Sequence, residues 1–344
     1  MQASYKKHIL NFKQPGGTSR GVLRTKETYF LVLSNKEKKG LGECGLFRGL
    51  SIDDRPDYEE KLQWVCANIH LGKEKILKQV SDLPSIQFGV EQAFISLQSS
   101  NMFELFPSDF TSGKDSIPIN GLIWMGSFDF MNQQIKEKLK AGFTTLKLKI
   151  GAIDFDAEIA LLKSIREEYT SKEIELRVDA NGAFTPENAL EKLKRLSDFE
   201  LHSIEQPIEP KQWEMMADLC EKTPLPIALD EELIGVFSLE DKEKMVNIIR
   251  PQYIILKPSL IGGFQGVQDW IRTAKQHNVS WWITSALESN IGLNAIAQFT
   301  YSLQVKMPQG LGTGGLFTNN IESPLIVEQG KLYYDPQIPW NFNL

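Results

Sequence analysis

Charged side chains stand directly after a series of short apolar runs in the second half of the chain. Neighbouring members of the series are separated by roughly 25 to 30 residues, about the length of one strand and one helix. If the runs are parallel strands of one barrel, their C-terminal ends meet at one face and bring these side chains together. The series comprises Lys147 and Lys149, Asp179, Glu205, Asp230, Lys257, and Ser285 followed by Glu288.

The carboxylates of this series form a set of hard oxygen ligands, and no cysteine or histidine accompanies them. Such a set suits Mg²⁺, with water and substrate oxygens completing the coordination. We therefore predict a magnesium site formed by Asp179, Glu205 and Asp230.

The lysines of the series point to proton transfer. Lys147 and Lys149 are two residues apart and share one face of a strand, and Lys257 would face them from four strands later. The ordinary lysine pKa of about 10.4 is too high for a base at neutral pH, but a neighbouring cation lowers it. Such a lysine could remove a proton next to a carboxylate while the metal stabilises the developing negative charge.

Each of these residues also has an ordinary interpretation when it is taken alone. Lys147 and Lys149 could be solvated lysines on an edge strand, Asp179 a turn former, and Glu205 a loop charge. Only the regular spacing of the whole series favours a site.

The elements that would position this series alternate between strand and helix. Amphipathic helical runs at 157–169, 186–196 and 266–277 intervene between the apolar runs, as in a parallel sheet. Because the runs are short and apolar on both faces, we prefer an α/β fold of the closed (β/α)₈ type to an open doubly wound sheet. The eight predicted strands lie at 117–124, 144–150, 174–178, 201–204, 226–229, 253–256, 281–284 and, weakly, near Met307.

The residues before this alternation form a different module. Short apolar runs broken by turn residues between Ile9 and Leu46 predict a hairpin or meander, and helical spacing follows from Tyr58 to Leu97. We therefore expect an α+β module of about 110 residues at the N-terminus.

The overall composition excludes several functions. The net charge of −6 and the scattered lysines and arginines disfavour nucleic-acid binding. No apolar run resembles a signal peptide or a membrane span, so we expect a cytoplasmic protein. The three cysteines lack metal-ligand or redox spacing and should be buried thiols. The glycines at 310–315 follow no strong strand, which argues against dinucleotide binding.

Six motifs in order resemble the muconate-lactonizing branch of the enolase superfamily. Within that branch the chain is most similar to the o-succinylbenzoate synthase family, through Gly40–Glu43, Glu288–Gly292 and the glycine-rich Gly312–Gly315. The superfamily motifs are Leu146–Lys149, Val178–Gly182, Ile204–Pro207, Leu229–Glu231, Leu256–Pro258 and Ser285–Ser289.

This resemblance implies an enolase-like modified TIM barrel at 113–322. An α+β N-terminal capping domain at 1–112 would close the barrel, and a C-terminal tail at 323–344 would return to that domain. It also implies that Asp179, Glu205 and Asp230 bind Mg²⁺, for which Mn²⁺ could substitute.

The family's reaction is the dehydration of a succinyl-hydroxycyclohexadiene carboxylate to o-succinylbenzoate, a step toward menaquinone. By resemblance, Lys149 is the base and Lys257 lies against the substrate ring as a cation, with Lys147 beside the base. Glu288 would either take part or support the site as a buried charge. The residues expected to hold the substrate are Asn181, Ser285, Ser289, Gly314 and, on a loop that covers the site, Arg20.

Two other functions stay open at this point. The same lysine pair would serve an N-acylamino acid racemase or a dipeptide epimerase, although the last barrel loop has Gly312-Thr313-Gly314 where dipeptide epimerases usually carry Asp-x-Asp. A catalytically idle barrel kept as a binding or scaffold protein is the remote alternative. The four histidines match no strand end, unlike the mandelate-racemase-like branch. A small-molecule carboxylate is the expected partner, and a homo-oligomer is compatible with the sequence.

Overall fold

The computed structural model describes residues 1–18, 21–151 and 153–342. An antiparallel three-stranded meander opens the chain, as the turn pattern predicts: β1 (Gln2–Thr18), β2 (Gly21–Ser34) and β3 (Lys39–Cys44). Helices α1 (Tyr58–Asn68), α2 (Lys73–Gln79) and α3 (Pro84–Gln98) follow. Helix α3 lies so close to β3 that a Cβ on Gly42 would stand 2.0 Å from the carbonyl oxygen of Gly89. This close packing requires glycine at position 42.

The second half of the chain forms a parallel sheet in which neighbouring strands follow the sequence order. This sheet holds seven strands in the described part of the chain, ordered β11-β10-β9-β8-β7-β6-β5. The strands are β5 (Gly121–Ile123), β6 (Thr145–Lys149), β7 (Glu175–Asp179), β8 (Ser203–Glu205), β9 (Ile227–Leu229), β10 (Tyr253–Leu256) and β11 (Ser280–Ile283).

Two single-residue bridges close this sheet into a barrel. Gln309 pairs with Ile119 just before β5, and Gly310 pairs with Thr284 just after β11. The weak strand predicted near Met307 is therefore reduced to a closing bridge, because Pro308 lacks an N–H donor and Gly310 has little strand propensity.

The first predicted barrel run, 117–124, divides between two sheets. Its start forms β4 (Ile117–Pro118), which pairs with the C-terminal strand β13 (Lys331–Tyr334), and only Gly121–Ile123 joins the barrel. β12 (Leu325–Glu328) completes this small antiparallel sheet. Further on, Trp340 stacks on Phe103 with ring centroids 4.4 Å apart. The tail therefore contacts residues of the N-terminal module, and the boundaries 112 and 322 stay a prediction.

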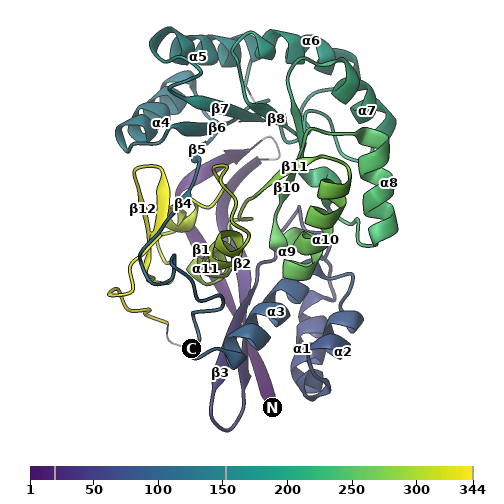
Figure 1. The fold of residues 1–344 in the computed structure, drawn as a ribbon, viewed down its shortest axis with the longest axis vertical. Helices are drawn as coiled ribbons and strands as arrows, with labels where there is room; N and C mark the ends of the chain where they lie inside the picture. Colours follow the sequence, from purple (N-terminus) through teal and green to yellow (C-terminus); the bar gives the residue numbers. More distant parts are fainter. Residues whose placement is uncertain (19–20, 152, 343–344) are drawn as a thin grey trace.

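Helices surround the barrel strands (Figure 1). Several begin at a side chain that accepts a hydrogen bond from the first turn, among them Ser127 before α4 and Asp154 before α5. None of the described helices is long and apolar enough to cross a membrane. The barrel helices are α4 (Phe128–Lys140), α5 (Phe155–Glu168), α6 (Pro186–Ser197), α7 (Trp213–Lys222), α8 (Leu239–Ile249), α9 (Pro258–Ile261), α10 (Gly263–Gln276) and α11 (Asn290–Ser302).

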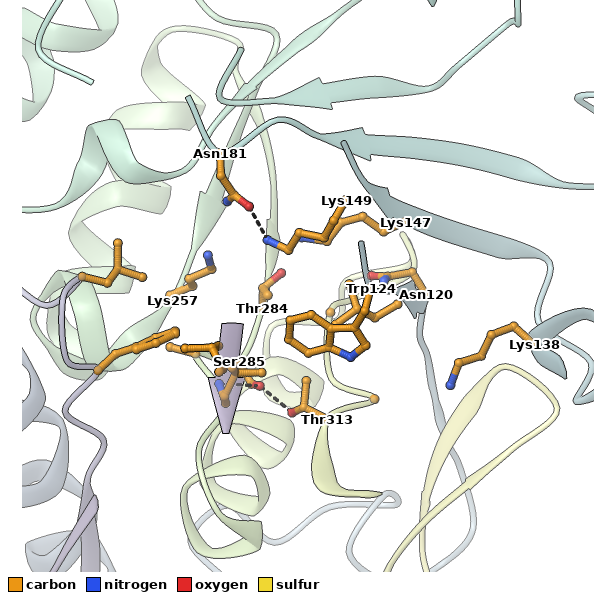
Figure 2. Close-up of a pocket in the computed structure, with 18 of the residues that line it drawn as sticks. Asn120, Trp124, Lys138, Lys147, Lys149, Asn181, Lys257, Thr284, Ser285 and Thr313 are labelled. Atoms are coloured by element: carbon orange, nitrogen blue, oxygen red, sulfur yellow. Dashed lines mark hydrogen bonds between the residues drawn. The ribbon is translucent and has the colours of Figure 1, made fainter. Parts of the chain in front are cut away.

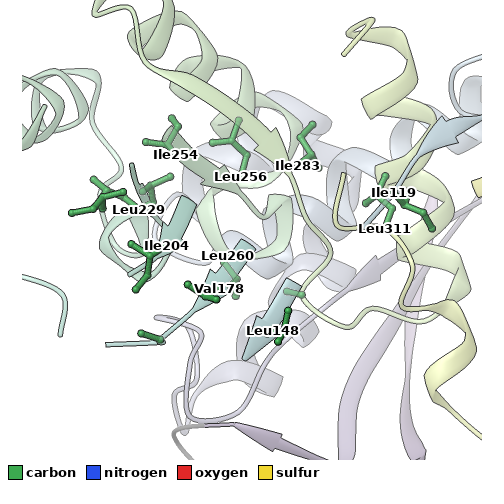
Figure 3. Packing of buried hydrophobic residues seen from close by; sticks show 14 of the residues in the cluster. Ile119, Leu148, Val178, Ile204, Leu229, Ile254, Leu256, Leu260, Ile283 and Leu311 are labelled. Atoms are coloured by element: carbon green, nitrogen blue, oxygen red, sulfur yellow. The ribbon is translucent and has the colours of Figure 1, made fainter. Parts of the chain in front are cut away.

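The main hydrophobic core lies between the barrel strands and these helices. Alternate residues of each strand, such as Leu148, Val178 and Ile204, point outward into it and are fully buried (Figure 3). The residues between them, including Lys149 and Asp179, therefore point into the barrel. The strand period that buries the core thus also directs the charged series inward.

Candidate active site

Three carboxylates meet at the C-terminal end of the barrel strands. Asp179 and Glu205 end the neighbouring strands β7 and β8 and lie in register, and Asp230 directly follows β9. Oxygen atoms of the three side chains lie within 4.8 Å of one another, and all three residues are buried. Glu205 Oε1 has no hydrogen-bond partner within the described residues. Three clustered carboxylates with one unsatisfied oxygen fit a divalent cation.

Lysines surround this cluster on two sides. Lys147 donates to Glu205 Oε2 at 2.7 Å and to Asp179 Oδ2 at 3.1 Å. Lys149 also donates to Asp179 Oδ2, at 2.7 Å. Lys257, from the opposite side, donates to Asp230 Oδ2. The predicted series is therefore assembled at one face, with the carboxylates between the lysines.

The protonation of the three lysines is shifted in different directions. Burial lowers the pKa of Lys149, and the positive charges of Lys147 and Lys257 lower it further, so that Asp179 does not restore the usual value. Burial also lowers the pKa of Lys147, but Glu205 and Asp179 outweigh it and raise the pKa. Asp230 and Glu231 likewise outweigh burial and raise the pKa of Lys257. Lys149 is thus the lysine most readily deprotonated.

The pKa values of the three carboxylates are also shifted in different directions. Burial alone would raise the pKa of Asp179, but the three lysines hold it far below the usual range. Burial raises the pKa of Glu205 to about 8, helped by the charges of Asp179 and Asp230 and opposed by Lys147. Burial also raises the pKa of Asp230. A divalent cation would relieve the repulsion among these groups and favour their charged forms.

Asn181 holds the predicted base. Its Oδ1 accepts from Lys149 Nζ at 2.8 Å, and its Nδ2 donates to Glu231 Oε1 at 2.9 Å. Both ends of the amide are thus engaged with protein groups. The predicted substrate-binding role of Asn181 stays a prediction, and its hydrogen bond orients Lys149.

A cavity of about 780 Å³, including its open mouth, lies above this cluster. Figure 2 shows Lys149, Lys257 and Asn181 pointing toward one another on one side of it, with Trp124 and Ser285 on other sides. Its apolar wall includes residues from the barrel and the N-terminal module: Leu122, Trp124, Ala286 and Leu287 from the former, and Leu23, Phe47 and Leu50 from the latter.

The other predicted substrate-binding residues are placed differently. Ser285 lines the cavity and shares a hydrogen bond of 2.6 Å with Thr313. Glu288 and Ser289 lie behind the wall, where Ser289 accepts from the Ile291 N–H and so begins α11. Gly314 follows the lining residue Thr313 and accepts from Asn320. Arg20 lies outside the described residues.

The sequence pattern did not single out several residues of the site. Thr284 lines the cavity, and Asn120 lines it from the turn before β5. Thr313 lines it from within the glycine-rich motif 312–315, of which only Gly314 was predicted to bind substrate. Glu231, which holds Asn181, directly follows a predicted metal ligand, so its place at a strand end could have marked it. Leu23, from the N-terminal module, carries no such signal.

The geometry defines a class of protein: a metal-type carboxylate cluster between opposed lysines, at the mouth of a barrel capped by a second module, is the site of a metal-dependent acid–base enzyme. Residues 131–336 match the family described as enolase C-terminal domain-like. The chain is also 48% identical to the o-succinylbenzoate synthase of Desulfotalea psychrophila, over 96% of this chain and 98% of the relative. The chain therefore belongs to the enolase superfamily and, within it, to the o-succinylbenzoate synthase family.

Solved structures agree with this placement. The crystal structure of MenC from Desulfotalea psychrophila superposes with a TM-score of 0.86 at 44% identity, covering 97% of this chain and 99% of that one. A dipeptide epimerase from Enterococcus faecalis, complexed with Mg and a dipeptide, reaches a TM-score of 0.84 at 21% identity, covering 97% and 96%. At that identity the second likeness shows the shared fold alone.

Proposed function

We propose that the chain is an o-succinylbenzoate synthase, a carbon–oxygen lyase. It would remove water from 2-succinyl-6-hydroxy-2,4-cyclohexadiene-1-carboxylate by syn elimination and yield o-succinylbenzoate in menaquinone biosynthesis. The observation that carries the proposal is the full-length similarity to such a synthase, together with two opposed lysines around a carboxylate cluster. A small-molecule carboxylate is thus the proposed partner.

Lys149 would act first, as the base. Burial and the neighbouring lysines lower its pKa against the opposing charge of Asp179, which brings Lys149 closer to a base at neutral pH. Its bonds to Asp179 and Asn181 hold the amine at the cavity. It would take the proton from the ring carbon that carries the carboxylate, which gives an enediolate. It would then return that proton to the hydroxyl on the neighbouring carbon, whose C–O bond breaks. Water leaves, the ring becomes aromatic and Lys149 is neutral again.

Lys257 would stay protonated throughout. Asp230 and Glu231 raise its pKa, so it is unsuited to act as a base at neutral pH. Its ammonium group lines the cavity opposite Lys149, where a cation can rest on the π face of the substrate ring. Lys147 contacts Asp179 and Glu205 and would keep their side chains in place.

Asp179, Glu205 and Asp230 would hold Mg²⁺, for which Mn²⁺ could substitute. The bound ion would supply positive charge against the negative charge that develops on the substrate carboxylate. The apolar wall formed by Leu23 and its neighbours would exclude water from the ring. Ser285 and Thr313 line the cavity, and whichever hydroxyl accepts the hydrogen bond between them would donate its own to the substrate.

The test follows loss of the diene absorbance when freshly prepared substrate is mixed with the protein and Mg²⁺. We expect rapid loss that stops on chelation of the metal and that is abolished in Lys149→Ala. Lys163→Ala, which removes a lysine on the outer helix α5 with 69% of its side chain exposed, is the matched control and should stay active. Absence of turnover by the wild-type protein would reject the proposal.

The racemase or epimerase hypothesis uses the same lysines, since they face one another across the cavity. It is not favoured, because the epimerase structure is related only at 21% identity. Deuterium uptake into N-acylamino acids or dipeptides, without dehydration of the diene, would support it. The cytoplasmic location and the homo-oligomer stay predictions.

A further inference from the structure

One stretch of the cavity wall has a demanding backbone conformation. Ser285, Ala286 and Leu287 line the cavity, and Leu287 has a φ of 63°, in the left-handed region. A bulky residue in that region is strained and persists only where the surroundings hold it. Inside the loop, the Ala286 N–H donates to Glu288 Oε2 at 2.7 Å.

Glu43 holds the end of this loop from the N-terminal module. It is fully buried on β3 and accepts hydrogen bonds from the Ser289 N–H at 2.9 Å, the Ser289 hydroxyl and the Gly292 N–H at 2.8 Å. Thr28 donates to it from β2 at 2.7 Å. A carboxylate there satisfies amide groups of the first turn of α11. The positive end of the helix dipole in turn stabilises its negative charge.

Lys26 lies two residues before Thr28 on β2, so its side chain leaves the strand on the face from which Thr28 donates to Glu43. It is 4% exposed, and its ammonium group has no hydrogen-bond partner within the described residues. Burial lowers its pKa, while the negative charges of Glu288 and Glu43 oppose the lowering. Burial raises the pKa of Glu288, and the charge of Lys26 opposes that rise. Removal of Lys26 would leave Glu43 and Glu288 without this counter-charge, which is unfavourable in an interior.

These three residues do not line the cavity, and they connect its wall to the N-terminal sheet. Glu288 accepts from Ser259 with Oε1 and from Ala286 with Oε2, so its carboxylate joins the loop to the helix that follows Lys257. Helix α11 contacts β3 directly. Docking of the N-terminal module and the shape of the loop are therefore coupled through Lys26, Glu43 and Glu288.

We propose that Lys26 and Glu43 are positioning residues that hold Ser285–Leu287 in the conformation that receives the substrate. The role of the substrate in this inference rests on the proposed synthase function. Because the hydrogen bonds of Ser285–Leu287 within the described residues involve neither Lys149 nor the three carboxylates, loosening of the loop weakens substrate binding and leaves the proton transfer intact.

The experiment compares Lys26→Met and Glu43→Gln with the wild-type protein loaded with Mg²⁺. In both variants we expect KM for the diene substrate to rise about tenfold while kcat changes by less than about threefold, since uniform binding is lost. Lys242→Met is the matched control: Lys242 is also buried, but its ammonium group donates to the Phe237 carbonyl in the helical layer. It should lose stability and keep the wild-type KM.

Hydrogen exchange of the metal-loaded proteins gives a readout that needs no substrate. Amides of residues 285–292 should exchange faster in Lys26→Met and Glu43→Gln, and at the wild-type rate in Lys242→Met. The charge-balanced double variant Lys26→Met/Glu288→Gln covers the case in which the single lysine variant does not fold, and it should show the same fast exchange. Unchanged KM and unchanged exchange in the folded variants would overturn the inference. An inactive wild-type protein would instead reject the synthase function, and the exchange rates would still decide the role of Lys26 and Glu43.

Discussion

The barrel interior contains buried charged residues in two layers, and their surroundings differ between the layers. At the mouth, Lys149, Asp179 and Glu205 crowd together and their protonation is strongly shifted. Two residues earlier on β7, and so one layer deeper, Arg177 is fully buried. Its Nε donates to Glu175 at 2.8 Å and its Nη1 to the Pro308 carbonyl at 3.0 Å.

Aromatic rings complete the deeper layer. The guanidinium group of Arg177 lies 4.6 Å from the ring centre of Trp282, a favourable cation–π distance. Tyr253 packs against Trp282 and His202, with ring centroids 5.4 and 4.9 Å apart. Ala228 and Ile255 fill the same layer, two residues before Asp230 and Lys257.

One strand pattern thus serves two purposes in this barrel. Inward-facing positions alternate along every strand, so each active-site residue has a partner position one layer below it. In the deeper layer the charge is stacked and hydrogen-bonded, and it stabilises the barrel. At the mouth, three carboxylates lie within 4.8 Å of one another beside three lysines, so we expect this layer to be reactive and, without a metal, to lower the stability.

The largest expected effect is on activity at the mouth. Glu205→Gln keeps the shape of the side chain but removes one metal-binding charge, so kcat/KM should fall by about 10³-fold. Steady-state kinetics with saturating Mg²⁺ measures this, with circular dichroism to confirm folding. Activity within tenfold of the wild type would show that Glu205 is not needed to hold the metal.

The reverse pattern is expected one layer deeper. Arg177→Met should lower the free energy of unfolding by about 3 kcal/mol, since it removes a buried, hydrogen-bonded charge from its aromatic neighbour. Its kcat should stay within about threefold of the wild type, because no contact of Lys149 is lost. Urea denaturation and kinetics measure the two effects. Arg195→Met, on the exposed surface of α6, is the control and should change neither. A large loss of kcat in a stably folded Arg177→Met would contradict the separation of the layers.

The charged series was predictable because the repeat of strand and helix places it. Lys147, Lys149, Asp179, Glu205, Asp230 and Lys257 all occupy the expected face, since strand ends in a parallel barrel share one side. The seven barrel strands were predictable for the same reason. The eighth strand, predicted near Met307, forms only a bridge at Gln309, because a run with proline and glycine makes few ladder hydrogen bonds.

Contributions from the N-terminal module could not be predicted in the same way. Lys26 lies in a polar stretch of β2 and would be expected to face solvent, yet it is buried. Leu23 and Phe47 line the cavity from segments more than a hundred residues before the base. Such placements depend on how the two parts pack, and no periodicity within either part encodes that packing.

Stability of the metal-free protein sharpens the contrast further. Glu205 has a pKa of about 8 in the folded protein, above its ordinary value of 4.5. The folded state therefore retains the proton to higher pH than the unfolded state, and stability falls as pH rises from about 4.5 to 8. The stability of Glu205→Gln relative to the wild type, in urea denaturation without metal, should therefore increase between pH 5 and 8, by about 4 kcal/mol at most. Glu328→Gln, at the exposed end of β12, is the control. If the difference in free energy of unfolding between Glu205→Gln and the wild type did not change with pH, the buried charge of Glu205 would not destabilise the folded protein.

The smallest effect is expected in the deeper layer and has the opposite sign. Burial lowers the pKa of His202, and the positive charge of Arg177 lowers it further. The negative charge of Glu175 opposes this lowering. Above pH 6.5 the imidazole is neutral in both states, so its packing is retained. Below that pH the unfolded state takes up the proton first, and stability falls. His202→Asn should flatten this decline in urea denaturation between pH 5 and 7, and His70→Asn, at an exposed position, should not.

Arg177→Met should also make this acid-side decline shallower, because a cation next to His202 has been removed. The two substitutions share one cause, so their effects on the pH dependence should not add in the double variant. Additive effects would mean that Arg177 and His202 act independently. The deeper layer would then consist of independent contacts. It would differ from the mouth in two ways: its charges would not be coupled to one another, and they would stabilise the fold.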